Sequence, residues 1–381
     1  MSNSGFWDLV IRSIAEKRIK GYTWEQIAED INYEYGKSYD KSTYRKRYNR
    51  MEKNENLDLL DDAYLELNKL RVKVRDERTQ TNANIRRLSR EETIKEIAHD
   101  FARQMSAKKI LEVPEPEEDT TLNLDGDWAL LNIGDWHYGL NIENSWNVYN
   151  VEVARQRIVK MMAEVRDDCW RHNVKHLVVN GLGDYISGNI HLPLRINSQE
   201  DVIGQTMEVS EIMAEMINTL SKYFYIDFYT VYGNHGRVTP NKKESIDLEN
   251  FERIIEWYIA RRLQDNPRVA IHMTEDGFGD MVAYDVKNWH VGLIHGDKDN
   301  VTKAVSNMTL MTRKPFDLVV TAHKHHLSAD ETNGCIVIAN PSLMGVDDYA
   351  KNLRVTSFPA QTLVIVGDKT PVECLYYIRL D

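Results

Sequence analysis

The chain has 381 residues, with 48 Lys and Arg against 59 Asp and Glu, a net charge of −11 and 42% hydrophobic residues. No apolar run is long enough to cross a bilayer, and the first residues lack the basic and apolar regions of a secretory signal. The three cysteines are scattered and form no CxxC pair, which excludes a disulfide framework and a zinc ribbon. We therefore expect a folded cytoplasmic protein with no membrane partner.

Charge is distributed unevenly along the chain. Residues 1–110 carry 23 basic and 19 acidic residues, a net of +4, whereas residues 111–381 carry 25 and 40, a net of −15. An excess of +4 is also within ordinary variation, but it coincides with a break: residues 112–127 hold two Pro and seven acids and are typical of a linker. We predict a small domain over 1–55, a helical arm or hairpin over 56–111, a linker over 112–127 and a large domain over 128–381.

Residues 6–50 are expected to form three short helices. An apolar face runs through residues 6–19, and Thr23 with Gln26 forms a capping-box pattern at the start of a second helix. The third segment, STYRKRYNR (42–50), is basic, so the order resembles a helix-turn-helix module whose last helix meets DNA phosphates. The candidate DNA-binding residues are Arg45, Lys46, Arg47 and Arg50. The alternative is a three-helix bundle used for protein contacts, with this basic helix merely solvated.

The following segment, residues 57–110, repeats apolar residues at three–four spacing, interrupted by the polar stretch 75–84. Such a stripe must be buried against something. It predicts either a self-associating arm, which would make the protein a homo-oligomer, or a helix pair that packs on the C-terminal domain.

The C-terminal part alternates short apolar runs with amphipathic stretches. Five runs end in Asp, Asn or His, and amphipathic stretches near 150–171, 199–222 and 245–264 separate the first four, as expected for an α/β fold. These runs are WALLNIGDWH (128–137), HLVVNGLGD (176–184), FYIDFYTVYGNHG (224–236), HVGLIHGD (290–297) and FDLVVTAHKHH (316–326). Strand ends that deliver polar residues to one sheet edge are a common way to build a site.

The polar residues after these runs have the chemistry of metal ligands. They are Asp135, His137, Asp184, Asn234, His295, His323 and His325. Carboxylate, carboxamide and imidazole donors together suit Mn, Fe or Zn at a mixed site. Seven donors are too many for one ion and suit two ions about 3.5–4 Å apart.

The ordered series Asp-x-His, Gly-Asp, Gly-Asn-His, His and x-His-x-His, spread over residues 128–345, resembles the metallo-dependent, calcineurin-like phosphoesterase superfamily. In site pattern it is most similar to the DNA-repair nuclease branch and to phage-encoded members. The resemblance implies an α/β (α+β) fold with a two-sheet β-sandwich flanked by helices over 128–381, joined here to an all-α N-terminal domain. It further implies two divalent ions, Mn²⁺ above Fe, Zn or Mg, and hydrolysis by a metal-bound hydroxide.

Carried over by position, the resemblance assigns Asp135, His137 and His325 to one metal. It assigns Asn234, His295 and His323 to the other, with Asp184 between the two. His235 would be the residue that contacts the phosphate and protonates the leaving oxygen.

The sequence departs from the family pattern at two positions beside the site. The family often has a second Asp that orients the catalytic His, but here the segment is Gly183-Asp184-Tyr185-Ile186-Ser187, so His235 is expected to be oriented differently. The usual acid after Gly-Asn-His is replaced by Gly236-Arg237, which would set a catalytic or substrate-binding cation beside the phosphate. Asn189 and His191 are further candidate substrate contacts, with a plain solvent-exposed loop as the alternative.

We therefore expect a dimetal phosphoester hydrolase, and specifically a DNA endo- or exonuclease tethered through its N-terminal domain. The alternative is a phosphatase or small-nucleotide phosphodiesterase whose N-terminal helices mediate oligomerisation. A third reading is a non-catalytic binding protein, although the intact ligand set counts against it.

Overall fold

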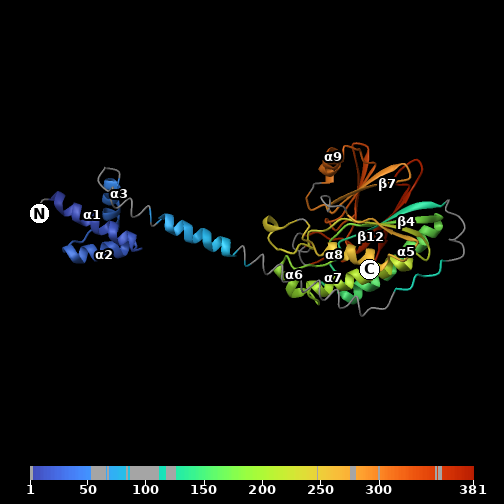
Figure 1. Ribbon diagram of the computed structural model, residues 1–381, viewed down its shortest axis with the longest axis horizontal. Coiled ribbons are helices and arrows are strands. Elements are labelled where there is room, and N and C mark those ends of the chain that lie inside the picture. The colour runs from blue at the N-terminus through green and yellow to red at the C-terminus, as the bar shows by residue number, and fades with distance from the viewer. Residues whose placement is uncertain are drawn as a thin grey trace. The chain divides into compact units, whose positions relative to one another are not determined.

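The computed structural model describes residues 3–52, 66, 68–82, 85, 111–116, 126–246, 248–274, 280–298, 301–347, 350 and 354–381. The chain divides into two compact units, Met1–Glu96 and Ile97–Asp381 (Figure 1). Of the predicted 56–111 arm, residues 68–82 are helical and the rest lies largely outside the described residues, as does much of the predicted 112–127 linker. Both therefore stay predictions. No helix in the described ranges is long and apolar enough to span a membrane.

Residues 3–52 of the first unit form three helices, as the sequence predicts. These helices are α1 (Asn3–Ile19), α2 (Trp24–Tyr35) and α3 (Lys41–Glu52). The capping box at α2 is formed in both directions: Gln26 N donates to Thr23 Oγ1 at 3.3 Å, and Thr23 N donates to Gln26 Oε1 at 2.9 Å. A buried apolar cluster joins the three helices, comprising Trp7, Val10, Ile14, Ile27, Ala28, Ile31 and Tyr44.

The basic side chains of α3 lie on the surface of this domain. Arg45, Lys46, Arg47 and Arg50 are all exposed, and the Arg47 guanidinium lies 4.3 Å from the centre of the Trp7 ring. Four cations therefore face solvent from one helix, in a different unit from the residues predicted to bind metal.

The second unit contains two main sheets. The first has the order β13-β12-β1-β4-β5-β6, in which β1, β4, β5 and β6 run parallel while β12 and β13 are antiparallel additions. Its strands are β1 (Asp127–Ile133), β4 (Val174–Gly181), β5 (Tyr225–Thr230), β6 (Val269–Ile271), β12 (Ala360–Val366) and β13 (Cys374–Arg379).

The second sheet has the order β10-β11-β9-β8-β7, with β8, β9 and β11 parallel and an antiparallel strand at each edge. Its strands are β7 (Met281–Val286), β8 (Trp289–Ile294), β9 (Leu318–Thr321), β10 (Ser328–Thr332) and β11 (Cys335–Ala339). A small hairpin is made by β2 (Ile142–Glu143) and β3 (Val148–Tyr149).

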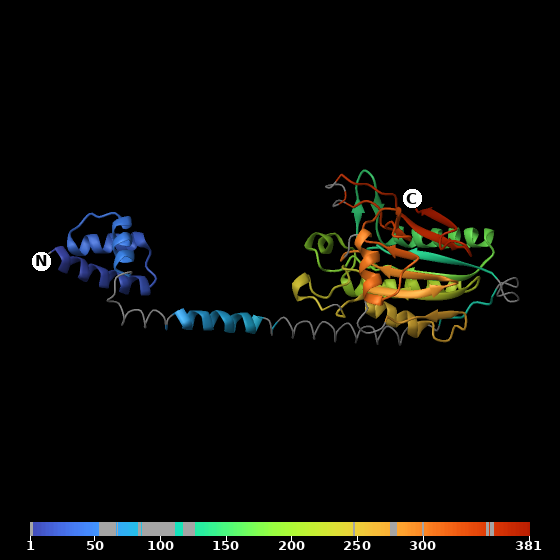
Figure 2. The same cartoon turned by 90° about the horizontal axis from the view of Figure 1, so that it is seen from above.

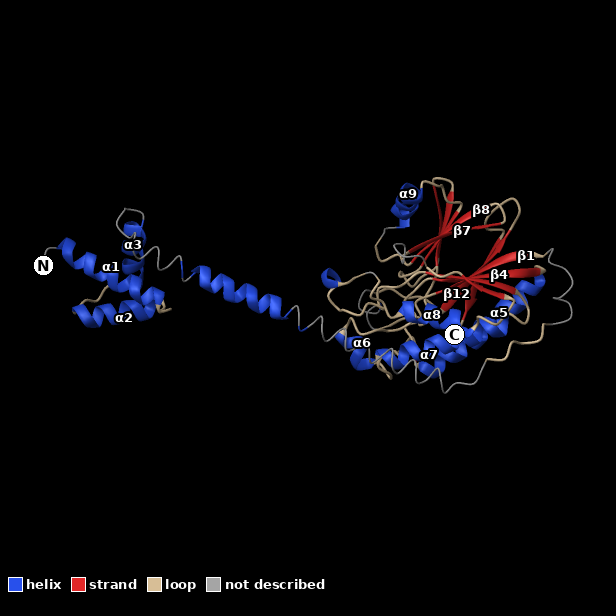
Figure 3. Cartoon of the chain, viewed as in Figure 1, coloured by secondary structure: helices blue, strands red, loops and turns tan. Residues whose placement is uncertain are grey.

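Helices cover the outer faces of the two sheets, so the unit has four layers (Figures 2 and 3). The helices are α5 (Val151–Arg171), α6 (Leu192–Asn197), α7 (Val202–Leu220), α8 (Glu252–Arg262) and α9 (Val301–Thr312), with a 3₁₀ turn at Lys242–Glu244. One core packs α5, α7 and α8 on the first sheet, a second lies between the sheets, and a third packs α9 on the second sheet. This arrangement confirms the predicted two-sheet sandwich flanked by helices with an all-α N-terminal domain.

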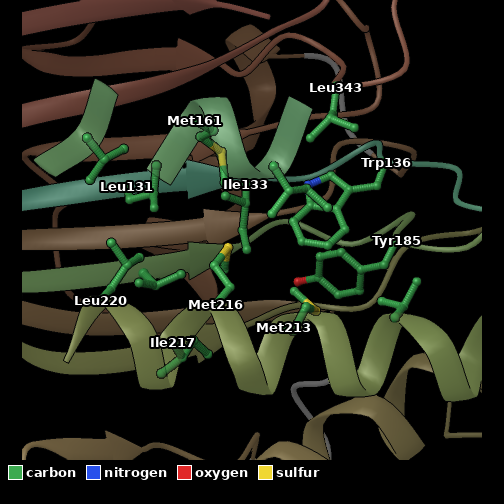
Figure 4. Packing of buried hydrophobic residues seen from close by; sticks show 14 of the residues in the cluster. Leu131, Ile133, Trp136, Met161, Tyr185, Met213, Met216, Ile217, Leu220 and Leu343 are labelled. Atoms are coloured by element: carbon green, nitrogen blue, oxygen red, sulfur yellow. The ribbon is translucent and has the colours of Figure 1, made fainter. Parts of the chain in front are cut away.

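The apolar sequence of the central strands explains why they are covered on both faces. In β1, the residues Ala129, Leu131 and Ile133 face the helical core, whereas Leu130 faces the core between the sheets. A strand buried on both faces carries an almost continuous apolar run rather than an alternating one, which is what the sequence shows here. Figure 4 shows the helical core, with Met213, Met216 and Ile217 of α7 beneath the strands.

Candidate metal centre

All seven predicted metal ligands follow parallel strands of the two sheets. Asp135 and His137 follow β1, Asp184 follows β4 and Asn234 follows β5, while His295 follows β8 and His323 and His325 follow β9. The carboxyl ends of parallel strands lie at one edge of a sheet, so each sheet presents its set at the same end. His323 N donates to Asp135 Oδ2 at 2.8 Å, which joins the set of one sheet to the set of the other.

The first group consists of Asp135, His137 and His325. The two imidazole Nε2 atoms lie 3.2 Å apart, and Asp135 Oδ1 lies 3.9 Å from His137 Nε2 and 3.6 Å from His325 Nε2. Ligands about 2.1 Å from one ion lie roughly 3.0–3.4 Å apart in octahedral or tetrahedral geometry. The His137–His325 distance lies in this range, and the two distances from Asp135 Oδ1 exceed it by a few tenths of an ångström, so the three donor atoms surround one point with room for a cation.

The second group consists of Asp184, His295 and His323, whose donor atoms all lie within 4.8 Å of one another. Asp184 Oδ2 lies 3.1 Å from His295 Nε2, and Asn234 Oδ1 lies 3.2 Å from the same nitrogen. His295 Nδ1 donates to the Leu182 carbonyl at 2.7 Å, which leaves Nε2 turned toward the group. A backbone acceptor on the far ring nitrogen is the usual support of a metal-binding histidine.

Asp184 also belongs to a third group, with His137 and His235, so it lies between residues of both predicted metal sites. Its Oδ1 accepts from His235 N at 2.7 Å, while Oδ2 lies 4.0 Å from His235 Nε2. A β-carbon on Gly233 would lie 2.1 Å from Asp184 Oδ1, so only glycine permits this close approach of the two loops.

The orientation of His235 answers the question raised by the missing second Asp. Its Nδ1 lies 2.9 Å from the carbonyl oxygen of Ser187, the residue that stands in the region of that Asp. A carbonyl only accepts, so Nδ1 carries the proton of this bond and Nε2 is the nitrogen turned toward Asp184. A backbone oxygen thus does here what a carboxylate was expected to do.

The ligand loops are anchored in the core by neighbouring aromatic rings. Trp136, between Asp135 and His137, and Tyr185, after Asp184, are both buried, with ring centroids 6.1 Å apart (Figure 4). Tyr185 Oη also lies 2.6 Å from Thr230 Oγ1. Burial of each ring fixes the direction of the polar residues beside it.

Several of the predicted ligands adopt a backbone conformation that is unusual for non-glycine residues. Five of them have positive φ, namely Asp135 (48°), His137 (45°), Asp184 (52°), His323 (66°) and His325 (59°). Such conformations cost of the order of 1 kcal/mol each and cluster at functional sites.

Two oxygens of the site show that cations fit it. Asp135 and Asp184 are fully buried, yet Asp135 Oδ1 and Asp184 Oδ2 make no hydrogen bond. A buried carboxylate oxygen without a donor is expensive unless a cation meets it. Both oxygens belong to the groups above, so the described residues have the donor types and the spacing needed to hold divalent ions.

The protonation states of four predicted ligands agree with this interpretation, and those of two do not. Burial and neighbouring imidazoles lower the pKa of His323 to about 4 and that of His325 to about 3, and hold the pKa of His137 well below its usual value. Burial alone would raise the pKa of Asp184, but His295 and His235 outweigh it and hold that pKa well below normal. Three imidazoles are therefore neutral and one carboxylate is ionised, which are the states that metal ligands adopt.

The two residues that differ are His295 and Asp135. Burial would lower the pKa of His295, but Asp184 and Asp135 outweigh it and raise that pKa to about 10, and burial raises the pKa of Asp135 well above its usual value. Metal binding at these two residues would release their protons.

The predicted substrate residues border this centre. The His191 ring lies 5.7 Å from that of His235, and burial followed by the charges of His235 and Arg237 lowers the pKa of His191. Asn189 Oδ1 and Arg237 Nε are buried without a hydrogen-bond partner. The structure thus brings His191 to His235 and the Arg237 charge within reach of His191, and the roles of all three residues stay predictions.

The sequence reasoning missed Asn250 and Glu252, at the start of α8. Glu252 is 1% exposed and accepts from the backbone N–H groups of Tyr185 and Gly233, each next to a predicted ligand. A lone acid before an amphipathic helix looks like an ordinary helix-start residue, so no local signal distinguishes it.

Comparison with known proteins gives two kinds of likeness. Among solved structures, the chain is similar to an archaeal phosphodiesterase (11% identity, 66% of this chain and 99% of that chain, TM-score 0.33). It is also similar to Vps29 from Entamoeba histolytica complexed with zinc (14%, 66% and 99%, TM-score 0.32) and to Vps29 from Cryptosporidium parvum (14%, 67% and 100%, TM-score 0.32). At these TM-scores and identities the likeness says nothing about activity.

In sequence, residues 2–60 match the family described as the YonJ N-terminal domain. Over 365 residues, 90% of this chain and 88% of the relative, the chain is 28% identical to the SPbeta prophage-derived uncharacterized protein YonJ of Bacillus subtilis (strain 168). The similarity to this prophage protein therefore extends over both units of the chain.

Proposed function

We propose that the protein is a dimetal-dependent phosphodiesterase and that its substrate is DNA. The observation that carries the proposal is the position of Asp184, which lies between the residues of two metal groups and has a buried oxygen without a hydrogen bond. One carboxylate between two sets of nitrogen and oxygen donors is typical of centres that bind two ions and hydrolyse phosphoesters.

In this proposal, Asp135, His137 and His325 hold one ion, and Asn234, His295 and His323 hold the other, with Asp184 between them. Bound divalent ions supply positive charge to a phosphate and lower the pKa of bound water. Mn²⁺ is our first candidate, and Fe and Zn accept the same mixture of carboxylate, carboxamide and imidazole donors.

His235 is proposed as the proton donor to the leaving oxygen. The Ser187 carbonyl holds its Nδ1, so its Nε2 faces the centre and can carry the transferable proton. On the same side, His191 and Arg237 offer a hydrogen-bond donor and a fixed positive charge to a phosphate oxygen.

DNA is proposed as the substrate because of the N-terminal domain. The exposed cations of α3 suit a row of phosphates, and a small helical domain with such a helix resembles a DNA-binding module. The prophage origin of the relative is consistent with a role in phage DNA metabolism.

The test is an incubation of the full chain with Mn²⁺ and supercoiled, linear duplex or single-stranded DNA, beside the small diester bis(p-nitrophenyl) phosphate. Asp184→Asn should abolish every activity, and EDTA should do the same. Intact DNA beside rapid turnover of the small diester would refute the nuclease proposal and favour a small-nucleotide phosphodiesterase. Turnover of a monoester alone would indicate a phosphatase.

A charge variant then tests the N-terminal domain. Arg45→Gln, Lys46→Gln and Arg50→Gln together spare Arg47, which lies over Trp7. They should weaken DNA binding and reduce the slope of log K for DNA against log[salt] by up to about 3. Hydrolysis of the small diester should not change. The matched control removes three exposed cations elsewhere, with Arg71→Gln, Lys73→Gln and Arg75→Gln. Equal effects of the two triple variants would contradict a specific role for α3.

A further inference from the structure

We propose that Glu252 is a positioning residue that fixes two ligand loops of the metal centre relative to each other, a proposal that rests on the metal centre of the proposed function. It acts through backbone groups, so it neither touches substrate nor appears in any pattern of ligand residues. Its partner in this task is Asn250, two residues earlier.

The contacts of Glu252 link two loops that are far apart in the chain. Its Oε1 accepts from Tyr185 N at 2.7 Å, and its Oε2 accepts from Gly233 N at 2.6 Å. Tyr185 follows Asp184, and Gly233 precedes Asn234. One carboxylate thus fixes the spacing between the loop that carries the shared ligand and the loop that carries Asn234 and His235.

The segment before α8 holds the second of these loops at both ends. Asn250 Nδ2 donates to the Gly233 carbonyl at 2.9 Å, and Phe251 N donates to the Gly236 carbonyl at 2.8 Å. Asn250 Oδ1 in turn accepts from Glu252 N at 2.9 Å. The turn Gly233–Gly236, which includes Asn234 and His235, is therefore attached to α8 at its first and last residues.

Both the length and the charge of Glu252 suit this role. Two backbone N–H groups converge on it, and a carboxylate offers two acceptor oxygens and no donor, whereas a glutamine would turn an NH₂ group toward one of them. Within the described residues, no Lys or Arg forms an ion pair with Glu252, Asp135 or Asp184. The two oxygens of Glu252 are satisfied by backbone N–H groups, so the oxygens that a bound cation would meet are those of Asp135 and Asp184.

The competing explanation is that Glu252 only secures α8 to the sheet. Glu256, four residues later on the same helix and also 1% exposed, provides the matched control. It accepts from Thr274 N at 2.6 Å, from Thr274 Oγ1 at 2.9 Å and from the Tyr232 hydroxyl, none of which is the backbone of a ligand loop. Loss of either carboxylate disturbs the packing of α8, but only Glu252 connects to Asp184 and Asn234.

The experiment compares Glu252→Gln with Glu256→Gln in the full chain. The readouts are Mn²⁺ stoichiometry and affinity by calorimetry, thermal unfolding with EDTA, and kcat and KM for bis(p-nitrophenyl) phosphate. We expect E252Q to bind Mn²⁺ about 10–100-fold more weakly, the range for residues that orient metal ligands, and E256Q to bind like the wild type. With EDTA the two variants should unfold at similar temperatures.

Unchanged Mn²⁺ affinity in E252Q, or equal losses in both variants, would overturn the proposal. If E252Q does not fold, Glu252→Asp and Glu256→Asp make the same comparison. Asp keeps the charge but is one methylene too short to meet both N–H groups. E252D alone should then lose affinity for Mn²⁺. A wild type that binds no Mn²⁺ refutes the metal centre itself, whereas a wild type that binds Mn²⁺ beside an E252Q of equal affinity refutes only the role of Glu252.

Discussion

Substitution of Asp184 by Asn is the sharpest test of a centre built for two ions. Asn has the same shape and keeps Oδ1 as the acceptor for His235 N, so the metal-free fold should survive. It replaces Oδ2, the buried oxygen that makes no hydrogen bond, by an NH₂ group that cannot bind a cation. The expected loss is therefore in metal affinity rather than in folding.

The magnitude follows from linkage. A free Mn²⁺ concentration 100 times Kd stabilises the folded state by about 2.7 kcal/mol per site. Residues that only orient metal ligands contribute up to about 100-fold in affinity, so loss of a direct ligand should cost at least that much. The same Mn²⁺ concentration would then equal Kd and stabilise the folded state by only about 0.4 kcal/mol. The difference of about 2.3 kcal/mol corresponds to roughly 4 °C in Tm for a unit as large as Ile97–Asp381, and to twice that if both sites are lost.

The assay is thermal unfolding with EDTA and with a fixed excess of Mn²⁺, so that the metal-induced rise in Tm is compared within each variant. Asp227→Asn is the control: Asp227 also pairs with a histidine, His272, at 2.7 Å, but belongs to none of the metal groups. If Mn²⁺ raises the Tm of D184N as much as that of the wild type, Asp184 is not a shared ligand. If D227N loses the Mn²⁺-induced rise in Tm as fully as D184N does, the loss is not specific to Asp184, and the reasoning is refuted as well.

Three further outcomes are expected. His235→Asn should keep the metal content measured by mass spectrometry and lower kcat about 10²–10⁴-fold; loss of metal would make His235 a ligand instead. The pKa values of His323 (about 4) and His325 (about 3) lie below the pKa of a histidine in the unfolded chain, so the folded state binds fewer protons between these values. The urea midpoint of the metal-free protein should therefore fall as the pH drops from 6.5 to 4. His323→Gln should flatten this fall and the exposed His326→Gln should not; the reverse would contradict the assignment. Thr23→Ala should destabilise the N-terminal domain by about 1 kcal/mol, seen in its urea midpoint, because it removes one bond of the capping box; an unchanged midpoint would count against that cap.

Much of the fold could be predicted because local pattern and burial coincide. The five apolar runs form β1, β4, β5, β8 and β9. The amphipathic stretches form α5 and α7 within three residues of their predicted limits, and α8, which begins seven residues later than predicted. The polar ends of the five runs converge because parallel strands end together, which is why the predicted ligands lie close to one another. The α2 cap was equally visible, since both of its partners lie within four residues.

What could not be predicted depends on contacts between distant segments. β12 pairs with β1 across more than 200 residues, with no local feature that marks it as the partner of that strand. The Ser187 carbonyl that orients His235 is a backbone atom, which every residue type possesses. Glu252 acts on backbone N–H groups 67 and 19 residues away, so its role became visible only when the two loops were seen together.

The division of the ligands between two sheets has a mechanical consequence. Four of the predicted ligands come from the six-stranded sheet and three from the five-stranded one: Asp135, His137, Asp184 and Asn234 in the first, and His295, His323 and His325 in the second. Each ion would then act as a cross-link at one end of the sandwich. At the opposite end the sheets are joined by Lys287, which pairs with Asp127 at 3.1 Å and Asp368 at 3.0 Å, and by Trp289 Nε1, which donates to the Gly367 carbonyl at 2.8 Å. Loading with metal should slow amide hydrogen exchange most in the strand residues nearest the ligand loops of both sheets, and this protection should fade along each strand toward its amino end.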